Sequence, residues 1–179
     1  RIAAESASLA EHLTTPPLQT AVRMSLEVVV QSATGEAVAL DAPGSDHKVI
    51  FGRSFIEETL LGLRFQVSTA AFFQVNTGAA EVILRVLREH CGLGPRAGRL
   101  DVCGGTGIIG LALARSVRRV IGVEICAAAV EDARANAVAN GITNAEFHAA
   151  KAEDAMRKIL GSLSADELEN VIAIVDPPR

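Results

Sequence analysis

Residues 100–110 read Leu-Asp-Val-Cys-Gly-Gly-Thr-Gly-Ile-Ile-Gly, and this stretch decides the fold. An apolar run ends in a cluster of glycines, and a second apolar run follows at once. Glycine lets the backbone reach positive φ and approach a ligand closely, while the first turn of a helix offers unpaired amides. The pattern therefore predicts a strand, a tight ligand-binding loop and the start of a helix.

An acidic residue stands where it can serve this loop. Glu124 ends the next apolar run, about 20 residues after Gly105. A carboxylate at that place in a parallel sheet can accept hydrogen bonds from both hydroxyls of a ribose. Gly105, Gly107 and Glu124 are therefore predicted to bind the nucleoside part of a cofactor.

Short apolar runs alternate with helical stretches around this motif. Strands are predicted at 99–103, 119–124, 145–149 and 171–176, and helices at 77–91, 109–116, 127–140 and 153–160. Strands that are apolar throughout and alternate with helices indicate a parallel sheet covered on both faces. A doubly wound α/β domain over residues 69–179 is therefore predicted. Ser164 and Glu167 have the spacing of a capping box, which indicates one further short helix.

Residues 1–68 have a different rhythm and are predicted to form a small strand-rich α+β segment. A helix is expected within 1–13, and a hairpin is expected from 26–30 and 37–40, with a further strand at 48–51. Leu61, Leu63, Phe65 and Val67 alternate with polar residues or glycine, which predicts a half-buried strand. In the helix at 77–91, the residues Val82, Ile83, Val86 and Leu87 share one face.

Composition excludes several classes of protein. Of the 179 residues 49% are hydrophobic and 21% are charged, which excludes disordered and low-complexity chains. The net charge of −4 argues against a strongly basic nucleic-acid module. No apolar run approaches the roughly 18 residues of a membrane span. Several arginines form either a phosphate-contacting patch or a solvated face: Arg85, Arg88, Arg96, Arg99, Arg115, Arg118 and Arg119.

The three cysteines indicate neither a disulfide framework nor a zinc site. Cys91, Cys103 and Cys126 are odd in number and lack C-x-x-C spacing, and no other metal-ligand spacing is present. Reduced thiols are typical of intracellular proteins, so we expect the cytoplasm, the nucleus or both.

Two interpretations of the nucleotide site are open. Gly105, Gly107 and Gly110 satisfy the dinucleotide fingerprint, which favours an NAD(P)-dependent oxidoreductase. Asp101, just before the loop, and the acidic, proline-stiffened end of the last strand at 176–178 favour a cationic adenosyl ligand and a substrate base. The second combination is typical of an S-adenosylmethionine-dependent methyltransferase.

Four blocks carry a closer resemblance. Ala-Phe-Phe-Gln-Val-Asn-Thr at 71–77, the block at 101–107, Val-Ile-Gly-Val-Glu at 120–124 and Asp-Pro-Pro-Arg at 176–179 resemble the RNA uracil-C5 methyltransferase family. The resemblance implies a class I S-adenosylmethionine methyltransferase fold, incomplete on its C-terminal side. It further implies methylation of uridine C5, with the T-loop uridine of tRNA, or another structured RNA, as substrate.

The resemblance also assigns roles to residues. Gln74 would contact the amino-acid end of the cofactor, Cys103 would line the pocket, and Asp176 would lie between cofactor and uracil. Glu153 or Asp154 would lie by the adenine. The cofactor-binding set that we expect is Gln74, Asp101, Cys103, Gly105, Gly107, Glu124, Glu153, Asp154 and Asp176.

No catalytic nucleophile is assigned within the chain. Uracil C5 becomes nucleophilic only after a thiolate adds at C6, and a base must then remove the C5 proton. In the family both residues follow the Asp-Pro-Pro-Arg motif, so we expect them beyond Arg179 and expect this chain alone to be inactive. A non-catalytic RNA-binding segment that keeps the methyltransferase fold is the remaining alternative.

Overall fold

The computed structural model describes residues 26–30, 46–51, 54–68, 71–74 and 76–177. The chain divides into two compact units, which are described separately. The first comprises residues 1–56 with 68–70, and the second comprises residues 57–67 with 71–179.

The described part of the first unit is mainly an antiparallel strand pair. Strand β1 (Leu26–Val30) pairs with β2 (Asp46–Phe51), with an irregularity in register after Leu26. The strand expected at 26–30 is confirmed, and its partner includes the run expected at 48–51. The helix expected within 1–13 and the strand expected at 37–40 lie outside the described residues.

The second unit contains a four-stranded parallel sheet. Its strands are β5 (Gly94–Val102), β6 (Val117–Glu124), β7 (Ala145–Ala149) and β8 (Val171–Val175), in the order β7-β6-β5-β8. All three pairings are parallel, and β5 pairs with both β6 and β8. The prediction of a parallel sheet in an α/β domain is confirmed.

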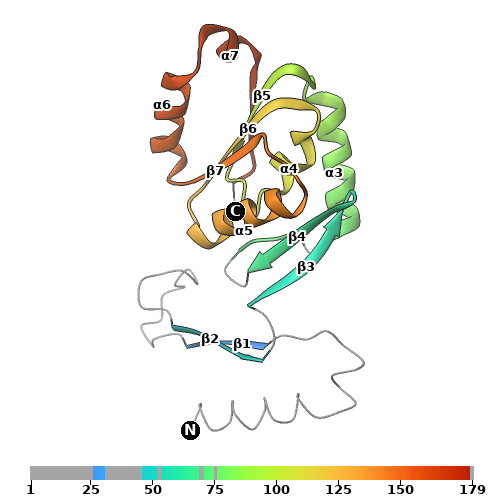
Figure 1. Ribbon diagram of the computed structural model, residues 1–179, viewed down its shortest axis with the longest axis vertical. Coiled ribbons are helices and arrows are strands. Elements are labelled where there is room, and N and C mark those ends of the chain that lie inside the picture. Colours follow the sequence, from blue (N-terminus) through green and yellow to red (C-terminus); the bar gives the residue numbers. More distant parts are fainter. Residues whose placement is uncertain (1–25, 31–45, 52–53, 69–70, 75, 178–179) are drawn as a thin grey trace. The chain divides into compact units, whose positions relative to one another are not determined.

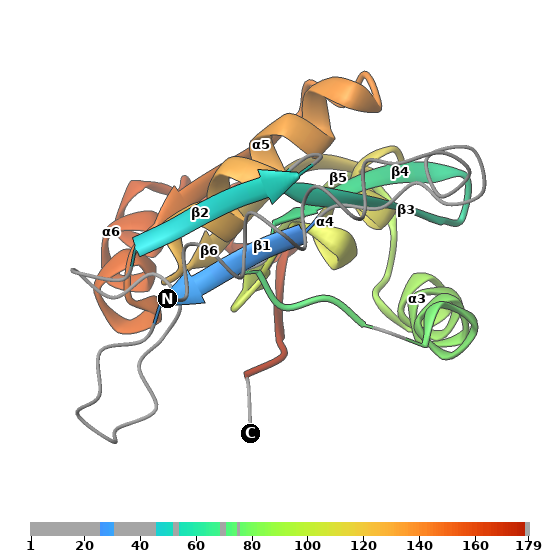
Figure 2. The ribbon, with the colours of Figure 1, turned by 90° about the horizontal axis from the view of Figure 1, so that it is seen from below.

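Five helices accompany the sheet in the described residues. They are α3 (Thr77–His90), α4 (Ile108–Ala114), α5 (Ala127–Ala139), α6 (Ala152–Ser162) and α7 (Ala165–Asn170). Each helix expected between residues 77 and 160 is present, and the expected capping box of Ser164 and Glu167 starts α7. Figure 1 shows α6 and α7 on one side of the strands and α3 on the other, and Figure 2 shows the same separation from below.

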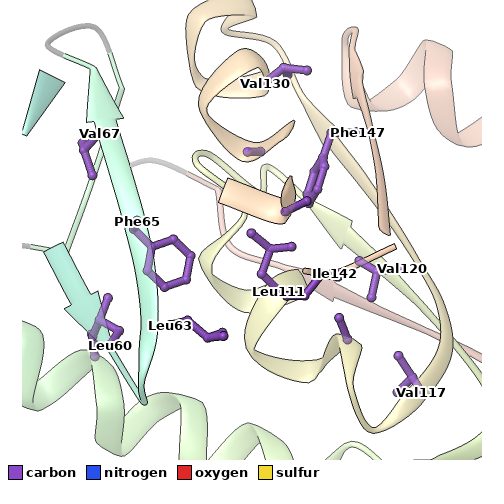
Figure 3. Packing of buried hydrophobic residues seen from close by; sticks show 14 of the residues in the cluster. Leu60, Leu63, Phe65, Val67, Leu111, Val117, Val120, Val130, Ile142 and Phe147 are labelled. Carbon is purple, nitrogen blue, oxygen red and sulfur yellow. The ribbon is translucent and has the colours of Figure 1, made fainter. Parts of the chain in front are cut away.

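Two apolar clusters lie on the two faces of the sheet. On one face, residues of α4 and α5, such as Leu111 and Val130, pack against Val120 and Phe147 of the sheet (Figure 3). On the other face, Leu100, Val102 and Ile121 pack against α6. Helices thus cover both faces, as a doubly wound sheet requires.

A hairpin of β3 (Phe55–Leu60) and β4 (Leu63–Ser68) packs on the first face. Its two-residue turn, Leu61 and Gly62, has positive φ at both positions (49° and 76°), as a tight hairpin of this type requires. Leu63, Phe65 and Val67 are buried, so the expected alternation is confirmed for these three residues. Leu61, which was expected in the same strand, lies in the turn instead. Figure 3 shows the Phe65 ring pointing from β4 toward Leu111.

The apolar stripe of α3 does not form its buried face. Val82, Ile83 and Val86 are 55%, 52% and 48% exposed, while Ala80 and Leu84 are buried. The helix therefore packs through a small residue and a leucine one turn apart. An amphipathic pattern identifies an apolar face but not the surface that covers it.

Arg99 of β5 is a buried cation that lies against the carboxyl end of α3. Its guanidinium donates hydrogen bonds to the carbonyls of Cys91, Gly92 and Gly98, and its side chain is almost fully buried. Carbonyls at the carboxyl end of a helix carry partial negative charge, so they compensate a cation that burial alone would disfavour. Burial lowers the pKa of Arg99. Arg99 therefore belongs to neither a phosphate-contacting patch nor a solvated face.

We predict that Gly122→Ala destabilises the second unit. Gly122 pairs with Phe147 across β6 and β7, and a Cβ at Gly122 would lie 2.3 Å from Cδ1 of that ring. Forced displacement of a packed ring costs about 1–3 kcal/mol in the free energy of unfolding. Urea unfolding measures the change.

Gly161→Ala is the matched control for this prediction. A Cβ at Gly161 in α6 would meet no atom within 4 Å, and alanine favours a helix by up to about 1 kcal/mol. The expected result is unchanged or increased stability. Equal destabilisation by both substitutions would contradict the packing argument.

Candidate functional site

The parallel sheet brings the candidate residues to its carboxyl edge. Cys103 follows β5, Glu124 ends β6, and Asp176 follows β8. Glu153 and Asp154 lie in the first turn of α6, directly after β7. Ligands of open α/β sheets bind at this edge. Residues far apart in sequence thus meet where the sequence predicted a site.

The loop between β5 and α4 is a left-handed turn. Cys103, Gly105 and Gly107 have φ values of 63°, 53° and 81°, and the Gly107 amide donates to the Gly104 carbonyl over 2.9 Å. Glycine adopts this conformation without strain, whereas Cys103 adopts it at a cost. The loop lies at the carboxyl edge of the sheet. Its last residue, Gly107, is the N-cap of α4.

The Asp101 side chain fills the space beneath this loop. It is almost fully buried, and its Oδ2 accepts a hydrogen bond of 2.8 Å from the Gly110 amide. A Cβ at Gly104 would lie 3.0 Å from the Asp101 carboxyl group, and one at Gly110 would lie 2.9 Å from Oδ2. The glycines at 104 and 110 therefore make room for the carboxyl group, and the loop closes over it.

Three carboxyl groups make this edge electronegative. Burial, opposed by the Gly110 amide and reinforced by Asp176 and Glu124, raises the pKa of Asp101 to about 6. Burial and the same acids raise the pKa of the Cys103 thiol. The site therefore favours a cationic ligand, and its cysteine stays protonated.

Glu124 is held in place by two backbone amides. Its Oε2 accepts from the Gly105 amide over 3.1 Å, and its Oε1 accepts from the Cys126 amide over 2.9 Å. A carboxylate oxygen has two lone pairs, so each oxygen can still accept a ligand hydroxyl. The acid expected to hold a ribose is thus preorganised at the mouth of the glycine loop.

Residues 71–74 run beside the loop. The Phe72 carbonyl oxygen would lie 3.7 Å from a Cβ at Gly105, and Gln74 is half-buried in the same segment. Two large apolar side chains flank this region and were not expected from the sequence: Phe72 is 73% exposed and Ile125 is 68% exposed. Ile125 could have been noticed in the sequence, because it is an apolar residue directly after Glu124. Both side chains are apolar surface that lies close in the chain to candidate site residues.

The remaining candidates show a looser arrangement. Glu153 and Asp154 are exposed in the first turn of α6. The exposed Asp176 is anchored through its backbone amide, which donates to the Val102 carbonyl over 3.3 Å. Asp176 therefore lies beside the carboxyl end of β5.

Hollows of the described surface lie at the opposite edge, near Arg118 and Arg119. Arg119 pairs with Glu146 over 2.6 Å, and Arg118 lies 3.8 Å from Glu167. Acidic side chains thus compensate the positive charge of both arginines. This edge is therefore a weak candidate for an anion-binding site.

The described residues contain no cluster of three or more His, Cys, Asp or Glu side chains arranged to hold a metal ion. They also contain no helix with the length and apolarity that crossing a membrane requires.

We predict that Asp101 makes stability fall as pH rises from about 4 to about 6. The folded chain keeps the Asp101 proton up to a pKa of about 6, whereas an unfolded aspartate has a pKa of 3.8. The folded state binds more protons in that window, so the free energy of unfolding decreases, by about 3 kcal/mol in total.

Asp101→Asn removes this titration and keeps an oxygen for the Gly110 amide. The stability of the variant relative to the unsubstituted chain should therefore rise between pH 4 and pH 6 and level off above that range. Urea unfolding across this pH series measures the difference. Parallel pH profiles of the two chains would contradict the assignment.

The chain is similar in sequence to known methyltransferases. A family model described as "Methyltransferase domain" matches residues 97–172. The chain is 45% identical over 172 residues to tRNA (uracil-5-)-methyltransferase homolog A of Homo sapiens, covering 96% of this chain and 27% of that protein. It is 44% identical over 137 residues to homolog B of Homo sapiens, covering 75% of this chain and 26% of that protein.

A crystal structure of Pyrococcus abyssi tRNA (uracil-54, C5)-methyltransferase with S-adenosyl-L-homocysteine is 32% identical, at a TM-score of 0.49. The match covers 56% of this chain and 25% of that one.

The chain spans about a quarter of the length of the two human relatives described above. The matched methyltransferase domain spans all four strands of the parallel sheet in part or whole, and it includes the glycine loop that closes over Asp101. The chain is therefore similar, along nearly its whole length, to part of tRNA (uracil-5-)-methyltransferase homolog A, and its second unit has the fold of a class I methyltransferase domain.

Proposed function

We propose that this chain is the cofactor-binding part of an enzyme that methylates uridine C5 in RNA. The observation that carries the proposal is the similarity, along nearly the whole chain, to a protein named tRNA (uracil-5-)-methyltransferase. We propose tRNA as the substrate, with the T-loop uridine as the methylated position, and an intracellular location.

The residues at the carboxyl edge fit S-adenosylmethionine. Glu124 would hold the ribose hydroxyls, and the loop at Gly105 and Gly107 would let the ligand approach the backbone. Gln74 and Asp101 would lie toward the amino-acid end. When bound, this cofactor supplies a methyl group activated by a sulfonium. We assign Glu153 or Asp154 to the adenine and Asp176 to the space between cofactor and uracil.

Charge distinguishes this cofactor from a dinucleotide. Asp101, Glu124 and Asp176 lie near enough to one another to shift the pKa of Asp101. Such a cluster attracts a sulfonium and an ammonium group but repels the pyrophosphate of NAD. An oxidoreductase is therefore the less favoured function.

The described cysteines are poor candidates for the thiol that adds to uracil C6. Burial and three neighbouring acids raise the pKa of Cys103, which keeps the unreactive thiol form at neutral pH. Cys91 is buried at the end of α3. Cys126 precedes α5 on the ribose side, where its amide donates to Glu124. We therefore assign the nucleophile to none of them.

We predict that Glu124→Ala weakens binding of S-adenosylhomocysteine at least tenfold. The substitution removes an acceptor for two ribose hydroxyls, and hydrogen bonds to a charged group contribute roughly 1.5–3 kcal/mol each. Isothermal titration calorimetry with S-adenosylmethionine, S-adenosylhomocysteine and NAD measures the affinities.

Glu131→Ala is the control, because Glu131 is an exposed acid of α5 that pairs with Arg134. Its affinity should stay within twofold of the unsubstituted chain. An unchanged dissociation constant for Glu124→Ala would refute the ribose assignment, and tighter binding of NAD than of either adenosyl ligand would refute the cofactor.

The substrate proposal has its own test. The enzyme of which this chain is the proposed cofactor-binding part is incubated with labelled S-adenosylmethionine and unmodified tRNA, and the nucleosides are then analysed for 5-methyluridine, which should carry the label. A tRNA with cytidine in place of the T-loop uridine is the control. Equal labelling of the two RNAs would contradict the proposed position.

In the enzyme of which this chain is the proposed cofactor-binding part, we predict that Cys103→Ala leaves covalent capture of 5-fluorouracil-containing tRNA unchanged. Because Cys103 is partly buried in the loop, its replacement by alanine leaves a small cavity, which should lower the free energy of unfolding by about 1 kcal/mol. Denaturing gel electrophoresis detects the adduct. An adduct formed by the unsubstituted protein but absent in this variant would show that Cys103 is the nucleophile.

A further inference from the structure

Helix α5 pairs with the hairpin through side-chain amides. Asn136 accepts from the Gln66 amide over 2.6 Å and donates to the Gln66 carbonyl over 3.0 Å. One turn later, Asn140 accepts from the Arg64 amide over 2.9 Å and donates to the Arg64 carbonyl over 2.6 Å. Each asparagine thus presents to β4 the donor and acceptor that a neighbouring strand would present.

The two asparagines differ in their third hydrogen bond. Asn136 donates over 3.1 Å to the carbonyl of Thr106, inside the glycine loop, whereas Asn140 donates over 2.8 Å to the Asn136 carbonyl of its own helix. Asn136 and Thr106 are each 1% exposed, so this bond is shielded from water. Only Asn136 connects the strand to the loop.

A second contact joins α5 to the same loop. A Cβ at Gly107 would lie 3.1 Å from the Cβ of Ala133, which shares the loop-facing side of α5 with Asn136. The amide of Asn136 uses both hydrogens and its oxygen in the three bonds described. No other side chain of similar size has two donors and an acceptor to replace it.

The connection joins two segments that border the candidate site. Residue Gln66 belongs to β4, and the chain beyond β4 includes residues 71–74, which run beside Gly105 and contain Gln74. Thr106 lies between Gly105 and Gly107 of the loop. One buried amide thus ties the strand that leads to Gln74 to the loop that faces the ribose.

We propose that Asn136 is a positioning residue for the cofactor loop. It holds the loop backbone at Thr106 in register with β4, and so preorganises the surface that binds the adenosyl ligand. This inference rests on the proposed function, because it takes the loop as the cofactor site.

The test compares Asn136→Ala with Asn140→Ala, which removes equivalent bonds to β4 but none to the loop. Both variants should lose stability in urea unfolding. Asn136→Ala should also weaken binding of S-adenosylhomocysteine about tenfold, roughly the effect of one lost hydrogen bond. Asn140→Ala should stay within twofold.

Hydrogen exchange provides a readout that needs no ligand. The amide of Gly107 is bonded to the Gly104 carbonyl within the loop, so its exchange rate reports loop opening. Asn136→Ala should accelerate this exchange about tenfold more than Asn140→Ala. Asn136→Ser, which keeps a small polar side chain, replaces the alanine variant if that variant does not fold.

The outcomes separate the two proposals. Equal effects of the two alanine variants on affinity and on Gly107 exchange would overturn the positioning role while leaving the cofactor assignment intact. If the unsubstituted chain does not bind the ligand, the proposed function fails. The exchange comparison then still decides whether Asn136 holds the loop.

Discussion

The buried carboxyl group of Asp101 is the constraint on which the site depends. Its bond to the Gly110 amide fixes the first turn of α4 against β5, and the loop between them must pass over the carboxyl group. This explains why Gly104 and Gly110 lack side chains: a Cβ at Gly104 would lie 3.0 Å and one at Gly110 2.9 Å from the Asp101 carboxyl group, both closer than ordinary van der Waals contact. The cost is a buried acid whose pKa rises to about 6. The loop geometry is thus obtained at the expense of stability near neutral pH.

The same acid determines the chemistry of the edge. Asp101, Glu124 and Asp176 together favour positive charge and disfavour thiolate formation at Cys103. A surface of this kind suits a ligand that carries a sulfonium and an ammonium group, and it suits neither a pyrophosphate nor a nucleophilic cysteine. Under the proposed function, cofactor binding and nucleophilic attack would therefore use different parts of the protein.

Helix α5 links this edge to the rest of the second unit. Its small residues allow close contact with the loop, while Asn136 and Asn140 satisfy the backbone of β4. Phe65 and its apolar neighbours in the hairpin complete the core on that face. A second set of polar contacts, from Arg99 to the carbonyls that end α3, anchors the helix that precedes the sheet. Both devices use polar side chains, of which Asn136 and Arg99 are buried, in place of further backbone pairing.

The sequence alone determined the periodic elements and the loop. The strand at 145–149 and the capping box at Ser164 were predicted at their observed positions, because both depend on residues close together in the chain. The position of Glu124 followed from the regular spacing of strand, loop and helix. The tertiary structure alone decided which face of α3 is buried, why Arg99 is tolerated inside, and what Asn136 contacts. Those properties depend on residues as far as 70 positions apart, and no local pattern in a sequence records such distances.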